Sequence, residues 1–223
     1  QVLHQGAAAL RGVLAHAGGS YTLSRPQDIE AAAAVERDAV VDCAAVLRAA
    51  GLPCPVVSVG STPTATFARD LTGVTELRAG VFMFGDLVQA GIGACRIDDI
   101  ALSVLATVIG RQPGKGWIIV DAGWMALSRD RGTSRQAIDQ GYGVVCAADG
   151  SPYPDLLLLD ANQEHGIIGV RPGSAGALPD LPLGSKLRIL PNHACATAAQ
   201  YDGYHVLAPD GGIAAIWPRI NGW

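Results

Sequence analysis

The pattern of apolar residues changes partway along this 223-residue chain. In the first part, short apolar runs such as 55–59 alternate with longer segments of helical character such as 29–47, which is rich in Ala, Val and Leu. This alternation is typical of a parallel α/β sheet or barrel. In the second part, short apolar runs follow one another with turns such as Pro113-Gly114 between them, as in a β domain. We therefore expect an α/β part over 1–96 and a β-rich domain over 97–223.

The expected elements follow from these runs. In the α/β part we expect strands at 10–16, 55–59 and 76–84 and helices at 29–47 and 64–70. In the β-rich part we expect strands at 101–109, 116–120, 143–147, 156–159, 166–170, 186–190, 204–208 and 213–217. Ser24, as a cap, and Pro26 indicate where the first helix begins, and Gly51 indicates where it ends.

Composition excludes several classes of protein. The chain has 16 basic and 20 acidic residues, a net charge of −4 and no cluster of basic residues, so we expect no nucleic-acid partner. Its apolar runs are well short of the roughly 20 residues that cross a bilayer, which argues against a membrane protein. The five cysteines are irregularly spaced, which does not suit a disulfide framework and favours a cytoplasmic location.

Three loops follow the expected strands of the α/β part, at 16–21, 60–64 and 78–81. Ligand sites in parallel α/β folds lie at such C-terminal strand ends. In the second loop, Gly60-Ser61-Thr62 offers backbone N–H groups and two hydroxyls ahead of a helix, an arrangement that suits phosphate. The alternative is an ordinary turn in which Ser or Thr caps the helix.

The other two loops carry an imidazole, a phenol and a guanidinium. His16 and Tyr21 flank a glycine-rich turn, so both could face a ligand, or they could be a core histidine and a half-buried tyrosine. Arg78 stands at a strand end two residues before Gly80, where the backbone could approach a ligand closely. Alternatively, Arg78 is a surface residue of its loop.

A candidate metal site follows the expected strand 186–190. In an extended segment, residues two positions apart lie on the same side, so the side chains of His193 and Cys195 would converge. An imidazole and a thiolate suit zinc; the alternative is a buried cysteine near a structural histidine. His205 could be an extra ligand, although a hairpin position is the stronger interpretation. For Glu164-His165 a polar turn is favoured over an acid–base pair, and Asp121 is interpreted as the end of a strand.

Several segments, taken in this order, resemble the pyridoxal-phosphate enzymes of the alanine-racemase-like fold, in the branch of D-serine dehydratase and D-threonine aldolase. The segments are HAGGSY (16–21), SVGSTPT (58–64), ELRAGVFMFGD (76–86), VDAG (120–123), QEHG (163–166), PNHACAT (191–197) and WPRINGW (217–223). The resemblance implies an α/β plus all-β architecture. The C-terminal part of a (β/α)8 barrel would hold the cofactor, and a β-rich domain would follow with a zinc site.

The resemblance also implies roles for the residues of these segments. Arg78 would face the pyridine nitrogen of pyridoxal 5'-phosphate, and His16 would stack near its ring. The residues implied to contact the cofactor or its phosphate are Tyr21, Gly60, Ser61, Thr62, Gly80 and Val81. By this resemblance, His193 and Cys195 match the metal-ligand pair of the dehydratases. In the aldolases the second ligand of the pair looks like an aspartate.

The function implied is a pyridoxal-phosphate- and zinc-dependent lyase that eliminates water and ammonia from a D-β-hydroxy amino acid such as D-serine. In this family the Schiff-base lysine lies on the first barrel strand, which the sequence lacks. Lys115 and Lys186 do not replace it, because both belong to the β-rich part. We therefore expect a fragment of a longer enzyme that begins mid-barrel, with no catalytic residue in this chain.

Alternative functions remain open at this stage. A D-threonine aldolase or an amino-acid racemase of the same fold would use the same cofactor, although a racemase would leave His193 and Cys195 without a role. A non-catalytic module that binds pyridoxal phosphate is a further alternative. By resemblance, we expect a small-molecule D-amino acid as substrate and a homodimer, with neither nucleic acid nor membrane as a partner.

Overall fold

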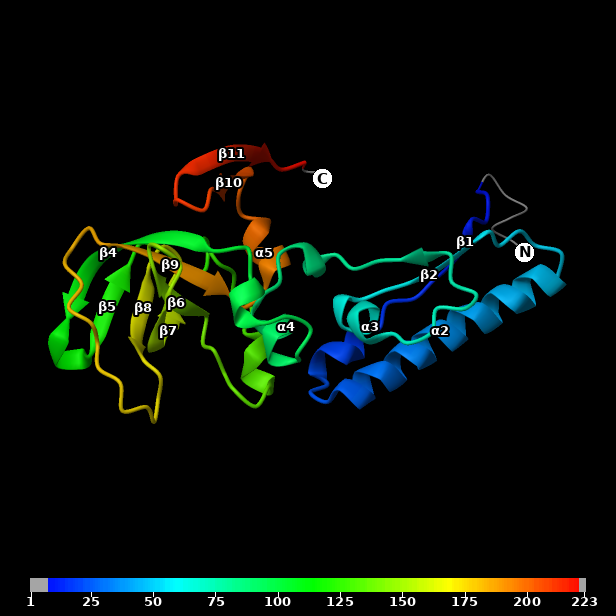
Figure 1. The fold of residues 1–223 in the computed structure, drawn as a ribbon, viewed down its shortest axis with the longest axis horizontal. Helices are drawn as coiled ribbons and strands as arrows, with labels where there is room; N and C mark the ends of the chain where they lie inside the picture. The colour runs from blue at the N-terminus through cyan, green and yellow to red at the C-terminus, as the bar shows by residue number, and fades with distance from the viewer. Residues whose placement is uncertain (1–7, 221–223) are drawn as a thin grey trace. The chain divides into compact units, whose positions relative to one another are not determined.

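The computed structural model describes residues 8–220 and divides into two compact units (Figure 1). The first unit runs to Met83 and also contains Gln89–Arg96. The second contains Phe84–Val88 and the chain from Ile97 onward. The short helix α4 (Leu87–Gly91) lies at the boundary in the sequence. Each unit has its own hydrophobic core, so each can be understood separately.

The first unit is built on a parallel sheet of three strands in the order β1-β2-β3. The strands are β1 (Gly12–Leu14), β2 (Val56–Val59) and β3 (Glu76–Leu77). The long helix α2 (Pro26–Ala49) packs on this sheet through apolar side chains that form one cluster with β2. The 3-10 helix η1 (Gly18–Thr22) follows β1, and helix α3 (Thr62–Phe67) follows β2.

Helix α2 begins and ends at residues with special backbone properties. Pro26 occupies the first helical turn, where its missing N–H costs nothing. A residue before proline is driven to extended geometry, and Arg25 (φ −107°, ψ 132°) is accordingly the N-cap, so the expected cap at Ser24 was wrong by one residue. Gly51 ends the helix with φ 73°. Among residues 8–220, no helix has both the length and the apolarity to cross a bilayer.

Two elements of this unit differ from expectation. The strand expected at 76–84 pairs only over Glu76–Leu77, because the chain then leaves the sheet and enters the 3-10 helix η2 (Val81–Met83). Helix α3 begins at Thr62 rather than at residue 64, because Ser61 caps it from outside.

The second unit is a closed barrel of six antiparallel strands in the order β4-β5-β8-β7-β6-β9. The strands are β4 (Val104–Gln112), β5 (Trp117–Val120), β6 (Gly143–Ala147), β7 (Pro152–Ala161), β8 (Gly166–Val170) and β9 (Lys186–Pro191). Short 3-10 helices are η3 (Ile97–Asp99), η4 (Pro113–Lys115) and η5 (Gly132–Arg135). Alternate residues of the strands point inward and fill the barrel with Val, Leu and Ile.

Helix α5 (Ala194–Ala198) follows the barrel, and a two-stranded hairpin of β10 (Gly203–Leu207) and β11 (Ile213–Pro218) comes after it. Every strand expected in the β-rich part overlaps a strand of the structure. The described residues therefore contain a three-stranded parallel sheet with helices and a closed antiparallel barrel. The (β/α)8 arrangement stays a prediction.

Leu158 offers a direct test of the barrel core. Its side chain is fully buried among the inward residues of the barrel. Leu158→Ala is expected to lower the free energy of unfolding by about 3 kcal/mol, because it leaves a cavity that the closed barrel cannot collapse. Leu105→Ala, on the outer face of β4 and 65% exposed, is the control and should cost less than about 1 kcal/mol. Urea unfolding of both variants that gave equal losses would contradict this core.

Candidate functional site

The loops that follow β1, β2 and β3 contact one another at the C-terminal edge of the parallel sheet. His16, after β1, donates its Nδ1–H to the carbonyl oxygen of Gly60, after β2, at 2.7 Å. Arg78, after β3, donates from Nε to Ser58 Oγ at 2.9 Å and from its terminal nitrogen to the carbonyl oxygen of Ala15. Three loops singled out from the sequence are therefore brought together.

Tyr21 lies near His16. Their ring centroids are 6.1 Å apart and their planes are inclined by 32°. The phenol is half-buried within the 3-10 helix η1, whereas His16 is exposed. The structure thus brings together an imidazole and a phenol at the loop after β1, with His16 oriented by its bond to Gly60.

Ser61 and Thr62 are buried where β2 leads into α3. Ser61 Oγ accepts from Thr64 N at 3.3 Å, and Thr64 Oγ1 accepts from Ser61 N at 3.3 Å, so the pair forms a capping box. Thr62 Oγ1 accepts from Phe82 N at 3.1 Å. Within residues 8–220 the hydroxyl proton of Thr62 finds no acceptor, so that it can be donated to a ligand.

Gly60 and Gly80 serve different purposes in these loops. Gly60 has φ 151°, and a Cβ there would lie 2.1 Å from the carbonyl oxygen of Arg78, so only glycine allows the two backbones to approach. Gly80 is exposed, and a Cβ on it would meet nothing within 4 Å. Among the described residues its N–H has no hydrogen-bond acceptor, and Val81 after it is buried.

His193 and Cys195 lie at the start of α5, directly after barrel strand β9. His193 is the N-cap residue with extended backbone (φ −134°, ψ 105°), while Cys195 is already inside the helix. The expectation that both residues are extended was wrong, but the two residues still stand together at the start of the same helix. His193 Nδ1 also lies 2.5 Å from a carboxylate oxygen of Asp130. The His193 side chain is 42% exposed, and Cys195 is exposed.

Cys195 and Asp130 change the acid–base properties of His193. The interaction with Cys195 has the largest effect and the bond to Asp130 adds to it, so that together they raise the pKa of His193 from its usual 6.5 to about 9. Burial opposes this shift. An imidazole held between a thiol and a carboxylate has one nitrogen oriented by Asp130, the arrangement found behind metal-bound histidines.

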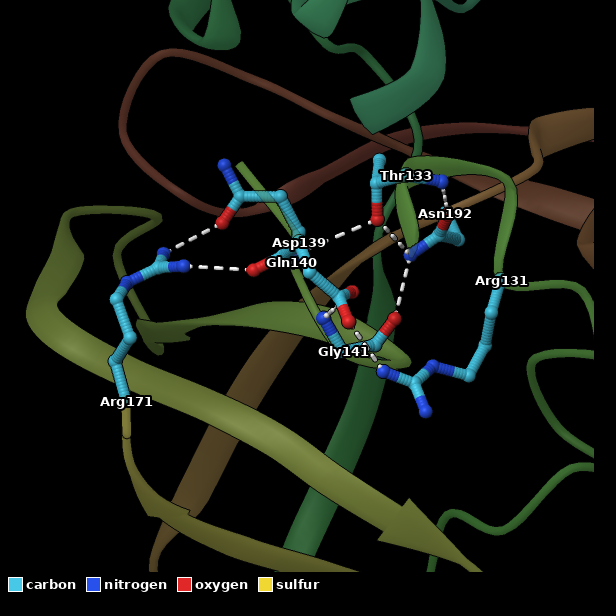
Figure 2. Close-up of polar contacts among 7 residues, drawn as sticks. All are labelled: Arg131, Thr133, Asp139, Gln140, Gly141, Arg171 and Asn192. Carbon is cyan, nitrogen blue, oxygen red and sulfur yellow. Dashed lines mark hydrogen bonds and ion pairs between the residues drawn. The ribbon is translucent and has the colours of Figure 1, made fainter. Parts of the chain in front are cut away.

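Asp130 is a residue that sequence reasoning missed, because 63 positions separate it from its partner. Its loop is attached to the end of β9 by buried polar groups (Figure 2). Thr133 N donates to Asn192 Oδ1 at 2.9 Å, and Asn192 Nδ2 donates to Thr133 Oγ1 at 3.1 Å and to the carbonyl oxygen of Gly141 at 2.6 Å. Since Asn192 precedes His193, the same network connects both partners of the Asp130–His193 bond.

Two arginines flank this network on opposite sides (Figure 2). Arg131 donates to the Asp139 carboxylate at 2.6 Å and lies over the ring of Tyr142. Arg171 donates to the backbone carbonyl oxygen of Asp139 at 2.7 Å and to Gln140 Oε1 at 2.6 Å. On the other side of His193, buried Asp86 accepts from Ala194 N at 2.9 Å and stabilises the first turn of α5.

The remaining sequence candidates occupy structural positions. His165 contacts Asn162 in the β7–β8 turn at 3.1 Å, and Asp121 accepts from Thr107 N at the end of β5. His205 lies in β10 opposite Ile216. Burial raises the pKa of the Cys146 thiol to about 11, which makes it a poor nucleophile.

The two lysines belong to the barrel. Lys115 lies 4.7 Å from the ring centre of Trp117, and Lys186 Nζ donates to Thr107 Oγ1 at 2.7 Å. Both lysines make contacts within the second unit.

Two family models together match most of the chain. The alanine racemase N-terminal domain matches residues 1–88, and the putative serine dehydratase domain matches residues 101–207. The D-threo-3-hydroxyaspartate dehydratase of Delftia sp. (strain HT23) is 58% identical over 100% of this chain. The D-serine dehydratase of Dictyostelium discoideum is 34% identical over 96% of it. The chain belongs to the D-serine dehydratase and D-threonine aldolase family.

Solved structures agree with this family assignment. The Delftia enzyme superimposes on 99% of this chain with a TM-score of 0.91, and the D-threonine aldolase of Filomicrobium marinum, 28% identical, covers 97% with a TM-score of 0.73. The resemblance of the sequence motifs to this family is thus confirmed. The chain spans 59% of the length of the Delftia dehydratase and 54% of that of the Dictyostelium enzyme.

The residues present fit the two groups that the family implies. For a phosphate, the loops after β2 and β3 provide the N–H of Gly80 and the O–H of Thr62, neither of which has an acceptor among the described residues. For a metal, His193 and Cys195 supply the nitrogen and sulfur donors that zinc prefers. Within residues 8–220 no group of three or more His, Cys, Asp or Glu side chains is placed so that it could hold a metal ion.

Proposed function

We propose that this chain is part of a lyase that eliminates water and ammonia from a D-3-hydroxy amino acid. The lyase would depend on pyridoxal phosphate and a divalent metal. The observation that carries this proposal is the placement of His193 and Cys195 at the start of α5, with Asp130 hydrogen-bonded to the imidazole. The 58% identical relative is named for dehydration of D-threo-3-hydroxyaspartate, and another for dehydration of D-serine.

The first unit would hold the cofactor. Pyridoxal phosphate, when bound, supplies an electron sink for the substrate α-carbon. Thr62, Gly80 and Val81 would bind its phosphate through O–H and N–H groups, next to the capping turn of Gly60 and Ser61. Arg78 would place its guanidinium toward the ring nitrogen, and His16 and Tyr21 would border the ring. The three-stranded parallel sheet would then be part of a (β/α)8 barrel.

The second unit would hold the metal. A metal on His193 and Cys195 supplies Lewis acidity at the substrate β-hydroxyl, which makes hydroxide a better leaving group. Solved structures of the Delftia enzyme include a cysteine-to-alanine variant in a metal-free form and a variant with the histidine two positions earlier replaced by alanine. The metal-free state of the cysteine variant supports a cysteine as a metal ligand in that enzyme. The soft thiolate favours zinc.

The products of the reaction test this proposal. The full-length enzyme of which this chain is proposed to be a part would be purified and incubated with pyridoxal phosphate, zinc and either D-serine or D-threo-3-hydroxyaspartate. We expect a keto acid and ammonia in equal amounts, and we expect a chelator to stop their release while added zinc restores it. The relative rates with the two substrates assign the preferred one.

Other products would overturn the dehydratase assignment. Glycine and an aldehyde from D-threonine would indicate an aldolase, to which this chain is also similar. Formation of the L-amino acid alone would indicate a racemase. Tight cofactor binding without turnover of any of these substrates would indicate the non-catalytic module.

A further inference from the structure

Helix α2 carries a buried carboxylate that has no part in the proposed reaction. Glu36 is 7% exposed and directs both oxygens toward the loops at the end of the sheet. Its Oε1 accepts from Ala17 N at 3.0 Å and from Gly60 N at 3.1 Å. Its Oε2 accepts from Thr64 Oγ1 at 2.7 Å. One side chain thus connects the loop after β1, the turn after β2 and the first turn of α3.

A buried carboxylate is costly unless its hydrogen bonds compensate for the lost hydration. Among the described residues, no arginine, lysine or histidine forms an ion pair with Glu36; the neighbouring Arg37 pairs with Asp38 and Asp70 instead. Glu36 is therefore held by N–H and O–H donors, and charge-assisted hydrogen bonds of this kind are strong and directional. It acts as a fixed acceptor for two backbone segments, which the bond of His16 to Gly60 also joins.

The segments that Glu36 joins carry the candidate phosphate residues. Gly60 is bound on both sides, because its N–H donates to Glu36 and its carbonyl accepts from His16. Thr64 bonds to Glu36 and also completes the capping box with Ser61. The backbone of the turn from Gly60 to Thr64 is consequently anchored to α2 at its beginning and at its end.

We propose that Glu36 is a positioning residue for the phosphate end of the cofactor site. It holds the turn 60–64 and the loop that begins at His16 in one arrangement, so that the binding groups are oriented before the ligand arrives. This inference rests on the proposed function, since it assumes that the turn binds the phosphate of pyridoxal phosphate. Pre-organised donors raise affinity because less ordering remains to be done on binding.

The variants of Glu36 distinguish the loss of the hydrogen-bond acceptor from a shortening of the side chain. Glu36→Ala leaves the N–H groups of Ala17 and Gly60 without their acceptor. Glu36→Gln keeps an oxygen for these N–H groups, and its amide N–H₂ can donate to Thr64 Oγ1, whose own proton turns to the carbonyl oxygen of Ser61 at 3.3 Å. Glu36→Asp keeps the charge but is one methylene too short to reach all three donors.

The experiment compares the dissociation constants of pyridoxal phosphate and of pyridoxal, which lacks the phosphate, for the full protein and its variants. We expect Glu36→Ala to weaken pyridoxal phosphate binding by about 10-fold, as when a charged hydrogen-bond acceptor is lost, and to leave pyridoxal binding nearly unchanged. Glu36→Gln should stay within about 3-fold of the wild type. Glu30→Gln, on the same helix in a surface pair with Arg69, is the matched control and should change neither constant.

Equal losses for the two ligands, or no loss for either, would overturn the inference and leave Glu36 with a merely structural role. If Glu36→Ala does not fold, Glu36→Asp takes its place, with the same preferential loss expected for the phosphorylated ligand. If the wild type binds both ligands equally, the proposed phosphate site itself is wrong. That result can be distinguished from a failure of the Glu36 inference, because it is measured on the wild type alone.

Discussion

Cys195→Ala is expected to remove the bound divalent metal and to lower the dehydration rate by more than about 100-fold, since even groups behind the ligands contribute 10- to 100-fold. Cys195 would supply one of only two protein donors, and a lone imidazole binds zinc weakly. His193→Ala should have an equal effect for the same reason. Metal content by mass spectrometry and the rate of keto-acid release would be measured on the same preparations.

Cys43→Ala is the matched control for this prediction. Cys43 is also an exposed free cysteine, but it lies on α2, so its loss should change neither metal content nor rate. Cys195→Asp adds a second comparison, because a carboxylate oxygen is a ligand of zinc as well. We expect it to retain more metal than the alanine variant. Full activity and metal content in Cys195→Ala would contradict the proposed metal site.

The β-rich part of the fold could be predicted in its elements but not in its arrangement. Local turns such as Pro113-Gly114 separate the strands, so their existence follows from neighbouring residues. The order β4-β5-β8-β7-β6-β9 does not, because pairs such as β4 with β9 join segments about 80 residues apart. In the first part, β3 ends at Leu77 although apolar residues continue, since tertiary contacts of the loop outweigh strand propensity.

The candidate site shows the same division between local and distant information. The pairing of His193 with Cys195 is contained in two positions of the sequence, whereas Asp130 joins them only through the fold. The buried position of Glu36 is predictable from the sequence. The buried positions of α2 are Ile29, Ala33, Glu36, Val40 and Ala44, a spacing of three and four residues in which a charged residue occupies a core position.

Asn192→Ala is expected to lower the free energy of unfolding by about 3 kcal/mol, near the upper end of single-residue effects. Asn192 is 2% exposed, and its amide satisfies the N–H of Thr133 and the carbonyl oxygen of Gly141 (Figure 2). Alanine would leave both backbone groups buried without a partner, and each such group costs about 1–3 kcal/mol. Urea unfolding measures the loss.

Gln140→Ala is the control within the same network, because it removes only the contact of the side chain with Arg171 and keeps the backbone bond to Thr133. It should cost less than about 1 kcal/mol. Asn192→Ala should also weaken metal binding by about 10-fold, since the loop it releases carries Asp130 to His193. If the two variants were equally stable, the buried amide would not hold this loop. If Asn192→Ala were destabilised yet bound metal normally, Asp130 would contact His193 without the network. Other contacts would then position the loop that carries Asp130.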